Sequence, residues 1–455
     1  MSDIIIVNPL EYNLTPEDMA MLQALYSRSD ESVRVHLEKV KASGSGKFMS
    51  SYYVGYGHDS IADTANVTVF LEGVSLMAAK AIQETPLYNG QECSTRYIDF
   101  SNHAVINPFE GKRGCHEIEL YHNNWLKFYT ELTIGISDKL KSLYPCTPDI
   151  PLPTWDNAIK AATFDICRAF LPVGITTNLS FTASLRQMRE HIISLFYHPL
   201  KEVSGLAKSV FQELQVLYPN TFQDTTARDN LDAWNQERVE VLKHLDIPDF
   251  YNHKSLAVID SEPALSLNLM AEDLVHKHLD FLNRRPRKGK FPREFARLGS
   301  YTFRFRLDYG SYRDLQRHRD LHINSPLFTG DICIHDWYLD RIWTLDRDLY
   351  KKTFDFLEIQ NGFLSAASRE FDIMDLQYLY PLGQEVDVSL CTSLPELVYV
   401  IELRSNSTVH PTLRRIIKGL SKILRSRING LVIYEDTSPI NQFCVYRGNQ
   451  VIYQN

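Results

Sequence analysis

The sequence predicts an α+β protein made of two copies of one domain, and three observations support this prediction. The chain has 455 residues, which is enough for two or three domains. A strand–helix–loop order occurs before residue 100 and occurs again after residue 297. β-Branched, alternating segments are followed by segments with helical spacing in both places. We therefore expect a first half at residues 1–235 and a second half at residues 236–455.

The first half contains the clearest elements. Residues 65–71 alternate in polarity and predict a strand, and the apolar spacing that follows predicts a helix as far as about Glu84. Residues 154–172 have helical spacing, and Pro172 ends that helix. Residues 174–184 are β-branched and alternating, which predicts a second strand. Two helices separated at Pro199 are expected to follow it.

The second half shows a similar order. Residues 298–330 predict a strand, a helix and a loop. Residues 387–405 predict a strand pair or a strand followed by a helix, and residues 412–427 predict an amphipathic helix. The two halves are expected to join near residues 225–245. The duplication is inferred from the order of the elements more than from sequence identity.

Composition narrows the class of protein. The net charge of -8 argues against a general binder of nucleic acid or membrane surfaces. The seven cysteines include no CxxC pair, and neither Cys115-His116 nor Cys333 with His335 has further ligands at metal spacing, so we expect no metal site. The first residues do not resemble a signal peptide, and no apolar run is long enough to span a membrane. A cytoplasmic protein with reduced thiols is the expectation.

Two cationic stretches suggest anion binding. Gln316–Asn324 crowds Arg317, His318 and Arg319 together. Such residues either complement the dipole of a helix C-terminus or face an anion, and the stretch alone leaves both interpretations open. Asn283–Arg297 is the most basic run and could contact RNA or a phosphate tail, but a solvated connector is the favoured interpretation.

Four motif fragments resemble the flavin-dependent thymidylate synthase family. Its signature is Arg-His-Arg, two residues, Ser, one residue, Asn-Glu, one residue, Ser, one residue, Arg-Tyr. "QECSTRY" at residues 91–97 keeps the end of the signature, and "RHRDLHIN" at residues 317–324 keeps its beginning. "YGHDSIADT" and "CRAFLPVGITTNLSFTASLRQM" resemble two further family segments. Each half has lost what the other keeps. Either the two halves share one site, or decay of the two halves has spared complementary pieces by chance.

The resemblance implies a fold, a site and a set of ligands. It implies that FAD and a deoxyuridine nucleotide bind side by side. The nucleotide would be bound by Gln91, Glu92, Ser94, Arg96, Tyr97, Arg168 and Arg186. The flavin would be bound by His58, Arg313, Arg317, His318, Arg319 and Asn324. Arg317, His318 and Arg168 are the residues expected to act in catalysis, and Arg404 and His410 align more loosely with family positions near the nucleotide.

Helix and loop geometry refine these roles. Ser94 and Arg96 would point the same way if their loop is extended. Four-residue spacing puts Arg313 and Arg317 on one helix face, and it also pairs Asp314 with His318, so Asp314 is expected to orient that imidazole. At the matching places the first half has Lys80 and Glu84, which we interpret as an ordinary surface ion pair.

The leading hypothesis is an enzyme. It would transfer a one-carbon unit from methylenetetrahydrofolate to C5 of dUMP, with FAD as the redox carrier and NADPH as the reductant, and the flavin would carry the chemistry. Two chains are expected to form a homodimer that mimics the family's tetramer. The alternatives are a flavin enzyme acting on another pyrimidine nucleotide, and a non-catalytic scaffold that binds flavin or nucleotide.

Overall fold

The computed structural model describes residues 5–48, 59–85, 87–222, 233–234, 237–238, 241, 262–440, 445–447 and 450–452. These residues form two compact units. Unit 1 comprises Met1–Gly73, Ala81–Glu92 and Asn178–Val239, and unit 2 comprises Val74–Lys80, Cys93–Thr177 and Glu240–Asn455. The units do not follow the predicted halves, because residues 93–177 of the first half fold together with the second half. The boundary between halves at residues 235 and 236 therefore stays a prediction.

Unit 1 has a helical part near its N-terminus. Its elements are α1 (Pro9–Tyr12), α2 (Pro16–Tyr26), α3 (Val33–Ser43), α4 (Gly46–Phe48) and η2 (Asp59–Thr64). A capping box between Thr15 and Asp18 begins α2, because each side chain accepts a hydrogen bond from the other residue's backbone N–H. Buried Glu17 on α2 accepts hydrogen bonds from the Thr221 backbone N–H (3.0 Å) and hydroxyl (2.7 Å). This carboxylate ties α2 to the segment that contains Thr221.

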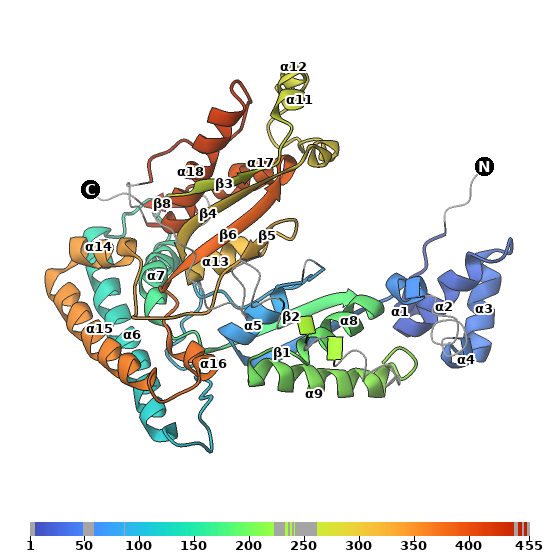
Figure 1. The fold of residues 1–455 in the computed structure, drawn as a ribbon, viewed down its shortest axis with the longest axis horizontal. Coiled ribbons are helices and arrows are strands. Elements are labelled where there is room, and N and C mark those ends of the chain that lie inside the picture. Colours follow the sequence, from blue (N-terminus) through green and yellow to red (C-terminus); the bar gives the residue numbers. More distant parts are fainter. Residues whose placement is uncertain are drawn as a thin grey trace. The chain divides into compact units, whose positions relative to one another are not determined.

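The rest of unit 1 is a pair of strands with helices packed against it (Figure 1). The elements are β1 (Asn66–Ser75), which pairs with β2 (Thr176–Ser184), the end of α5 (Leu76–Gln83), α8 (Leu185–Leu195) and α9 (Lys201–Leu217). Leu71, Phe181, Ile192 and Val203 line one apolar cavity. Strands and helices thus share one core in this unit, where the sequence predicts both strands.

Unit 2 contains a four-stranded antiparallel sheet of order β3-β4-β6-β5. Its strands are β3 (Ala264–Asn268), β4 (Ser300–Asp308), β5 (His322–Asn324) and β6 (Glu385–Ser393). Every second residue of β4 and of β6 is buried, so one face of the sheet packs against helices. Helices pack with a strand pair in unit 1 and with an antiparallel sheet in unit 2, which confirms the α+β class.

Helices make up most of the rest of unit 2. They are α6 (Cys115–Leu143), α7 (Leu152–Cys167), η3 (Arg168–Phe170), α11 (Glu272–His276), α12 (Leu279–Leu282), η4 (Arg293–Leu298), α13 (Tyr309–Gln316), α14 (Asp336–Leu345), α15 (Arg347–Ala367), α16 (Ile373–Leu376), η5 (Gln377–Leu379), α17 (Leu394–Arg404) and α18 (Pro411–Arg427). A short hairpin, β7 (Val445–Arg447) with β8 (Gln450–Ile452), lies against α7. None of the described helices combines the length and the apolar composition that crossing a membrane requires.

The order of elements repeats along the chain. In the first half, β1 runs directly into α5, and η3 is followed by β2, which runs directly into α8. In the second half, β4 runs directly into α13, and η5 is followed by β6, which runs directly into α17. The strand that begins each repeat pairs with the strand after its 3-10 turn. This repeated order supports the duplication predicted from the sequence.

Backbone hydrogen bonds in unit 2 repeat in the same way. Val173 N–H donates to the Tyr380 carbonyl (2.8 Å), and Leu382 N–H donates to the Leu171 carbonyl (2.7 Å). Each bond is the image of the other when Leu171-Pro-Val173 is aligned with Tyr380-Pro-Leu382. Pro172 and Pro381 face each other at the centre of this exchange. Two equivalent segments that contact each other reciprocally are what a two-fold related pair of domains presents.

Candidate functional site

The loop that carries the end of the family signature forms a turn in unit 2. Ser94 Oγ accepts a hydrogen bond from the Arg96 N–H (3.3 Å), and the Ser94 carbonyl accepts from the Tyr97 N–H (3.2 Å). The loop is therefore not extended, and the condition under which Ser94 and Arg96 would point the same way is not met. The Tyr97 side chain is half exposed.

Arg96 is paired with a carboxylate from α7. Its Nε and Nη2 donate to the two oxygens of Asp165 (2.5 and 2.7 Å), and Nη2 also donates to the Thr408 carbonyl (3.3 Å) and to the Tyr446 hydroxyl (3.2 Å). Burial alone would lower the pKa of the guanidinium, but Asp165 raises it well above its ordinary value. Arg96 is thus a permanent cation held in one orientation.

Arg168 is the most buried arginine of the site. It begins η3, directly after α7, and only 1% of its side chain is exposed. Its guanidinium donates to Ser311 Oγ (3.0 Å) and to Asp314 Oδ2 (3.3 Å), and it lies 3.5 Å from Asp308 Oδ2. Burial would lower the pKa of Arg168, but the charges around it raise that pKa further above its ordinary value. A first-half arginine is thereby fixed against second-half side chains within unit 2.

Asp308 explains how the partners of Arg168 are positioned. It is the N-cap of α13, where its carboxylate accepts from the Ser311 N–H (2.9 Å). The same oxygen accepts from the Tyr338 hydroxyl (2.9 Å). Ser311 Oγ in turn lies 2.7 Å from Thr412 Oγ1. The N-terminal turn of α13 is thus held by a buried hydrogen-bond network that ends on the Arg168 guanidinium.

Asp314 lies where cations from both halves meet. Its side chain is 25% exposed. Burial would raise the pKa of this carboxyl group, but the positive charges of Arg168, Arg96, Arg317 and Arg404 lower it below its ordinary value. We call Asp314 with these four arginines the arginine cluster. Asp165 and Asp308 also face two of these arginines, so four guanidinium groups meet three carboxylates, and the remaining positive charge lets the cluster accept a further anion.

Arg404 orients His318. The Arg404 Nε donates to His318 Nε2 (2.8 Å), and its Nη2 donates to the Asp314 carbonyl (3.0 Å). An arginine can only donate, so His318 Nε2 must accept and the ring proton must reside on Nδ1. Nδ1 lies 3.9 Å from Glu396 Oε1. The hydrogen bond that orients this imidazole therefore comes from Arg404, and not from Asp314 as helix spacing suggests.

Two titratable groups here have shifted pKa values. Burial first, and the charge of Arg404 second, lower the pKa of His318 to about 3. Burial first, and the charge of Asp320 second, raise the pKa of Glu396 to about 7. His318 is therefore neutral at neutral pH, while Glu396 exchanges its proton near neutrality.

The other predicted flavin residues lie on the same elements. Arg317 is the C-cap of α13, so the cationic stretch at residues 317–319 lies at a helix C-terminus. This agrees with the interpretation that these residues complement the helix dipole. Arg313 is buried on α13, while Arg319 is exposed. Asn324 lies on β5 opposite Ser389. His58 lies outside the described residues.

The other residues predicted to bind the nucleotide belong to unit 1. Glu92 accepts a hydrogen bond from the Gln83 side chain (2.7 Å), and the Gln91 N–H donates to Ser180 Oγ (3.1 Å). Arg186 forms a bidentate pair with Asp63. The roles of these residues as ligands stay predictions.

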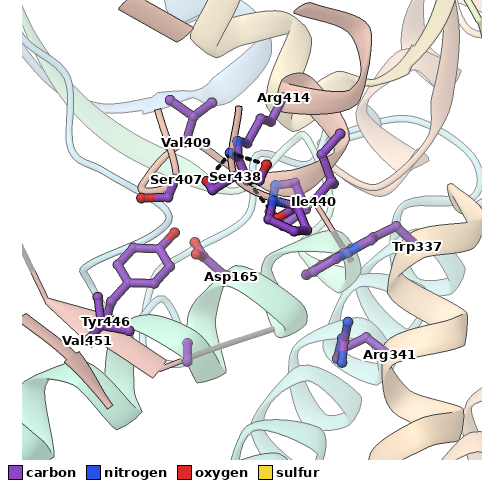
Figure 2. A pocket seen from close by; sticks show the side chains of 13 residues that line it. Asp165, Trp337, Arg341, Ser407, Val409, Arg414, Ser438, Ile440, Tyr446 and Val451 are labelled. Atoms are coloured by element: carbon purple, nitrogen blue, oxygen red, sulfur yellow. Dashed lines mark hydrogen bonds between the residues drawn. The ribbon is translucent and has the colours of Figure 1, made fainter. Parts of the chain in front are cut away.

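A cavity of about 170 Å³ borders the Arg96–Asp165 pair in unit 2. Figure 2 shows Asp165 and Tyr446 beside it, with Trp337 and Arg341 of α14 across from them. Its polar lining is largely engaged with the protein itself. Arg414, for example, donates to the Ser405 carbonyl (2.6 Å) and to Ser438 Oγ (2.6 Å).

Sequence reasoning missed several members of this arrangement. Asp165, Asp308 and Tyr338 match no family motif that we identified. For Asp308 a usable signal exists, because Asp directly before the first residue of a helix is an N-cap pattern. For Asp165 and Tyr338 we find no such signal.

Comparison with known proteins gives one family match and several distant relatives. Residues 10–220 match the family described as thymidylate synthase complementing protein. A UPF0159 protein of Thermoplasma acidophilum is 22% identical over an alignment that covers 92% of this chain and 95% of that protein. A UPF0159 protein of Chlamydia pneumoniae is 23% identical, covering 80% of this chain and 75% of that protein.

A solved structure also aligns with part of the chain. Thymidylate synthase X of Helicobacter pylori, crystallised with FAD and dUMP, aligns with 46% of this chain and 94% of its own at 15% identity, with a TM-score of 0.28. The family match includes both Arg96 and Arg168. The resemblance predicted from the sequence is confirmed: over residues 10–220 the chain is similar to the thymidylate synthase complementing proteins.

Proposed function

We propose that this protein is a flavin-dependent thymidylate synthase-type enzyme that methylates C5 of dUMP at the arginine cluster. The observation that carries the proposal is the composition of the cluster. Arg96 and Arg168 come from the segment that matches the family, whereas Arg317 and Arg404 come from the second half, and all four act on Asp314. The reciprocal loss of signature residues is then explained, because each half supplies one wall of a single site.

The donors of the cluster fit an anionic or electron-rich ligand. Among the described residues, the hydrogen bonds of Arg404 go to neutral groups, the His318 ring and a backbone carbonyl. Burial lowers the pKa of Arg404, and the neighbouring charges of Arg317 and Arg96 lower it further, although Asp314 opposes them. A bound phosphate, or a ring edge that carries negative charge, would relieve this repulsion through charge-assisted hydrogen bonds.

The residues then divide into roles. Arg317, Arg404 and neutral His318 would hold FAD, which supplies the redox chemistry when it is bound. Arg96 and Ser94 would hold the nucleotide. Asp314, fixed by Arg168, would keep the guanidinium groups at their positions. The resemblance implies methylenetetrahydrofolate as the carbon donor and NADPH as the reductant.

His318 would contribute a fixed hydrogen-bond donor. Its Nδ1 proton faces Glu396, so the ring presents one tautomer and no charge at neutral pH. A neutral imidazole beside the arginines adds no further repulsion. Orientation of the ring by Arg404 thus gives the site a donor at a defined atom.

A non-catalytic scaffold is the second candidate, and one observation favours it. Arg96 already donates to Asp165, Thr408 and Tyr446, so a nucleotide phosphate must displace at least one of these partners. If the displacement is too costly, the cluster remains a structural network.

A flavin spectrum followed by a dUMP titration tests the proposal. The purified protein, reconstituted with FAD, should show a bound-flavin spectrum that dUMP perturbs, and it should form dTMP with methylenetetrahydrofolate and NADPH. Arg404→Gln should weaken flavin binding, while Arg341→Gln, an arginine beside the cavity, should not. A colourless protein that FAD cannot reconstitute would support the scaffold.

A mixing experiment tests whether one chain holds both walls. Arg96→Ala and Arg317→Ala should each abolish activity. Because both residues act on Asp314 of the same chain, mixing the two variants should restore nothing. Recovery of a quarter or more of the native sites would instead place the walls on different chains of the proposed homodimer.

A further inference from the structure

The basic run predicted to be a connector is an ordered loop of unit 2. We call residues Asn283–Arg297 the basic loop. Its exposed cations are Arg284, Arg287, Lys288, Lys290, Arg293 and Arg297. Glu294 is the one acidic residue in the loop. So many exposed like charges repel one another unless an anion lies among them.

One buried arginine anchors the loop. Arg285 forms a bidentate pair with Glu402 of α17, and its Nη1 also donates to the Gly289 carbonyl (2.6 Å). Its guanidinium lies 5.1 Å from the centre of the Tyr434 ring and 5.7 Å from that of Phe291. An arginine paired and stacked in this way holds the loop in one conformation. The exposed cations are therefore presented on a rigid support.

The tip of the loop is a tight turn that contains two of these cations. The Gly289 N–H donates to the Pro286 carbonyl (2.8 Å), which places Arg287 and Lys288 at the centre of the turn. Lys288 has a φ of 68°, a region that favours Gly or Asn. A lysine there is strained, and such strain is concentrated at ligand-binding sites.

The loop is attached close to the arginine cluster. Glu402, which holds Arg285, lies two residues before Arg404 on α17, so the loop is attached about 3 Å along the helix axis from Arg404 but on another side of the helix. The last segment of the run, η4, also contacts α17. A ligand long enough to pass around α17 could therefore meet the cluster with one end and the basic loop with the other.

We propose that the basic loop binds the anionic tail of a co-substrate whose reacting ring lies at the arginine cluster. This inference rests on the proposed function. The shared chemistry is extra negative charge at a distance from the reacting ring, either the carboxylates of a γ-linked glutamyl tail on folate or the extra phosphate that distinguishes NADPH from NADH. The net charge of -8 and the attachment to α17 favour a small-molecule tail over nucleic acid.

Titration calorimetry of co-substrate analogues against the flavin-loaded protein tests the inference without turnover. The probes are paired so that only the tail differs: pteroylmonoglutamate with pteroylpentaglutamate, and NADH with NADPH. At low salt, the native protein should prefer the charged member of one pair by at least about tenfold. Arg287→Glu with Lys288→Glu should abolish that preference and change binding of the less charged member by less than about twofold.

A matched control separates a local effect from net charge. Lys351→Glu with Lys352→Glu makes the same change of charge on exposed positions of α15 and should leave the preference intact. A preference for pentaglutamate identifies the glutamyl tail, and a preference for NADPH identifies the phosphate.

Three results would overturn the inference. They are equal binding within both pairs, loss of preference in the α15 control, and tighter binding of a uridine oligonucleotide that displaces neither tail. The proposed function can fail separately. If the protein forms no dTMP but still shows a tail preference that depends on the basic loop, the role of the loop is supported and the proposed function is not.

Discussion

Arg168 and Gln377 occupy the same position in the two repeats but have different partners. Each begins the 3-10 turn that precedes the second strand of its half. Arg168 reaches Ser311 and Asp314 of the other half. Gln377 instead accepts from the Phe328 N–H (2.8 Å) and donates to the Phe328 carbonyl (3.0 Å) of its own half. One repeat has kept a charged network between halves, and the other has closed a loop on itself.

The loop that Gln377 holds is the counterpart of the nucleotide loop, and it is filled. Leu327 and Phe328 are buried, and the Phe328 ring packs against Tyr309 (4.9 Å between centres) and Tyr380 (5.0 Å). Thr329 stands where the first half has Arg96. Hydrogen bonds and aromatic packing have thus replaced charge at the second location. The comparison teaches that one chain should contain one competent site and not two.

Lys80, the first-half counterpart of Arg313, does not lie on the surface as predicted. The sequence suggests a surface ion pair with Glu84, but Lys80 is only 2% exposed. Its ammonium lies 5.6 Å from the centre of the Tyr312 ring. This lysine is part of the core of unit 2, because α5 runs into that unit where spacing alone suggests a solvated face.

The largest effect on stability should come from removing the positive charge of Arg168. Arg168→Met should lower the free energy of unfolding by about 3–5 kcal/mol, because Asp308 is fully buried and would lose its cationic partner. Gln377→Met should cost about 1–3 kcal/mol, since it leaves a backbone N–H and a carbonyl unpaired. Chemical denaturation measures both. Equal losses would mean that the charged network contributes no more than the closed loop.

The second effect concerns ligand binding. If Arg96 bonds the nucleotide, Arg96→Ala should weaken dUMP binding by about 1.5–3 kcal/mol, whereas Thr329→Ala at the repeat-equivalent place should not change it. Equilibrium titration should also give one nucleotide per chain. Arg96→Lys, which keeps the charge, should retain part of the affinity if the fold is intact. Two nucleotides per chain would contradict the comparison.

The segments that form the cluster can be predicted from the sequence because short-range patterns encode them. Alternation and helical spacing locate the strands and helices of both halves, and the motif fragments single out Arg96, Arg168 and Arg317. The partners of these residues are harder to predict. The i, i+4 rule identifies only neighbours on one helix, so it pairs Asp314 with His318. In the fold, Arg168 contacts Asp314 from a segment that is distant in the sequence. Asp165 escapes prediction for the same reason.

The third effect is a dependence of stability on pH. The folded pKa of Glu396 is raised to about 7, so folding binds a proton that the unfolded chain releases, and stability falls as pH rises toward 7. The folded pKa of His318 is lowered to about 3, so its contribution is lost as pH falls below its ordinary value of 6.5. The two groups oppose each other at mildly acidic pH.

Glu396→Gln separates the two contributions. Relative to the native protein, this variant should become more stable as pH rises from 5 to 8, because it lacks the raised carboxyl group. Of the two contributions, the variant should keep only that of His318, which lowers its stability as pH falls below 6.5. Unfolding curves measured across this range test the sign. A native-minus-variant difference that does not change with pH would contradict the burial of Glu396.

The smallest effect should come from Tyr446, and it decides whether Arg96 is a nucleotide ligand or part of a structural network. Its hydroxyl accepts from Arg96 (3.2 Å) and donates to the Thr408 carbonyl (3.0 Å). Tyr446→Phe should therefore lower the free energy of unfolding by only about 0.5–1.5 kcal/mol. If Arg96 is a nucleotide ligand that the protein must release, the same change should strengthen dUMP binding by up to a similar amount. If the cluster is a structural network, stability should fall while dUMP binding stays absent. Tyr144→Phe, a buried tyrosine of unit 2 outside the cluster, is the control, and a gain in affinity there would show that loosening any part of the unit mimics the effect.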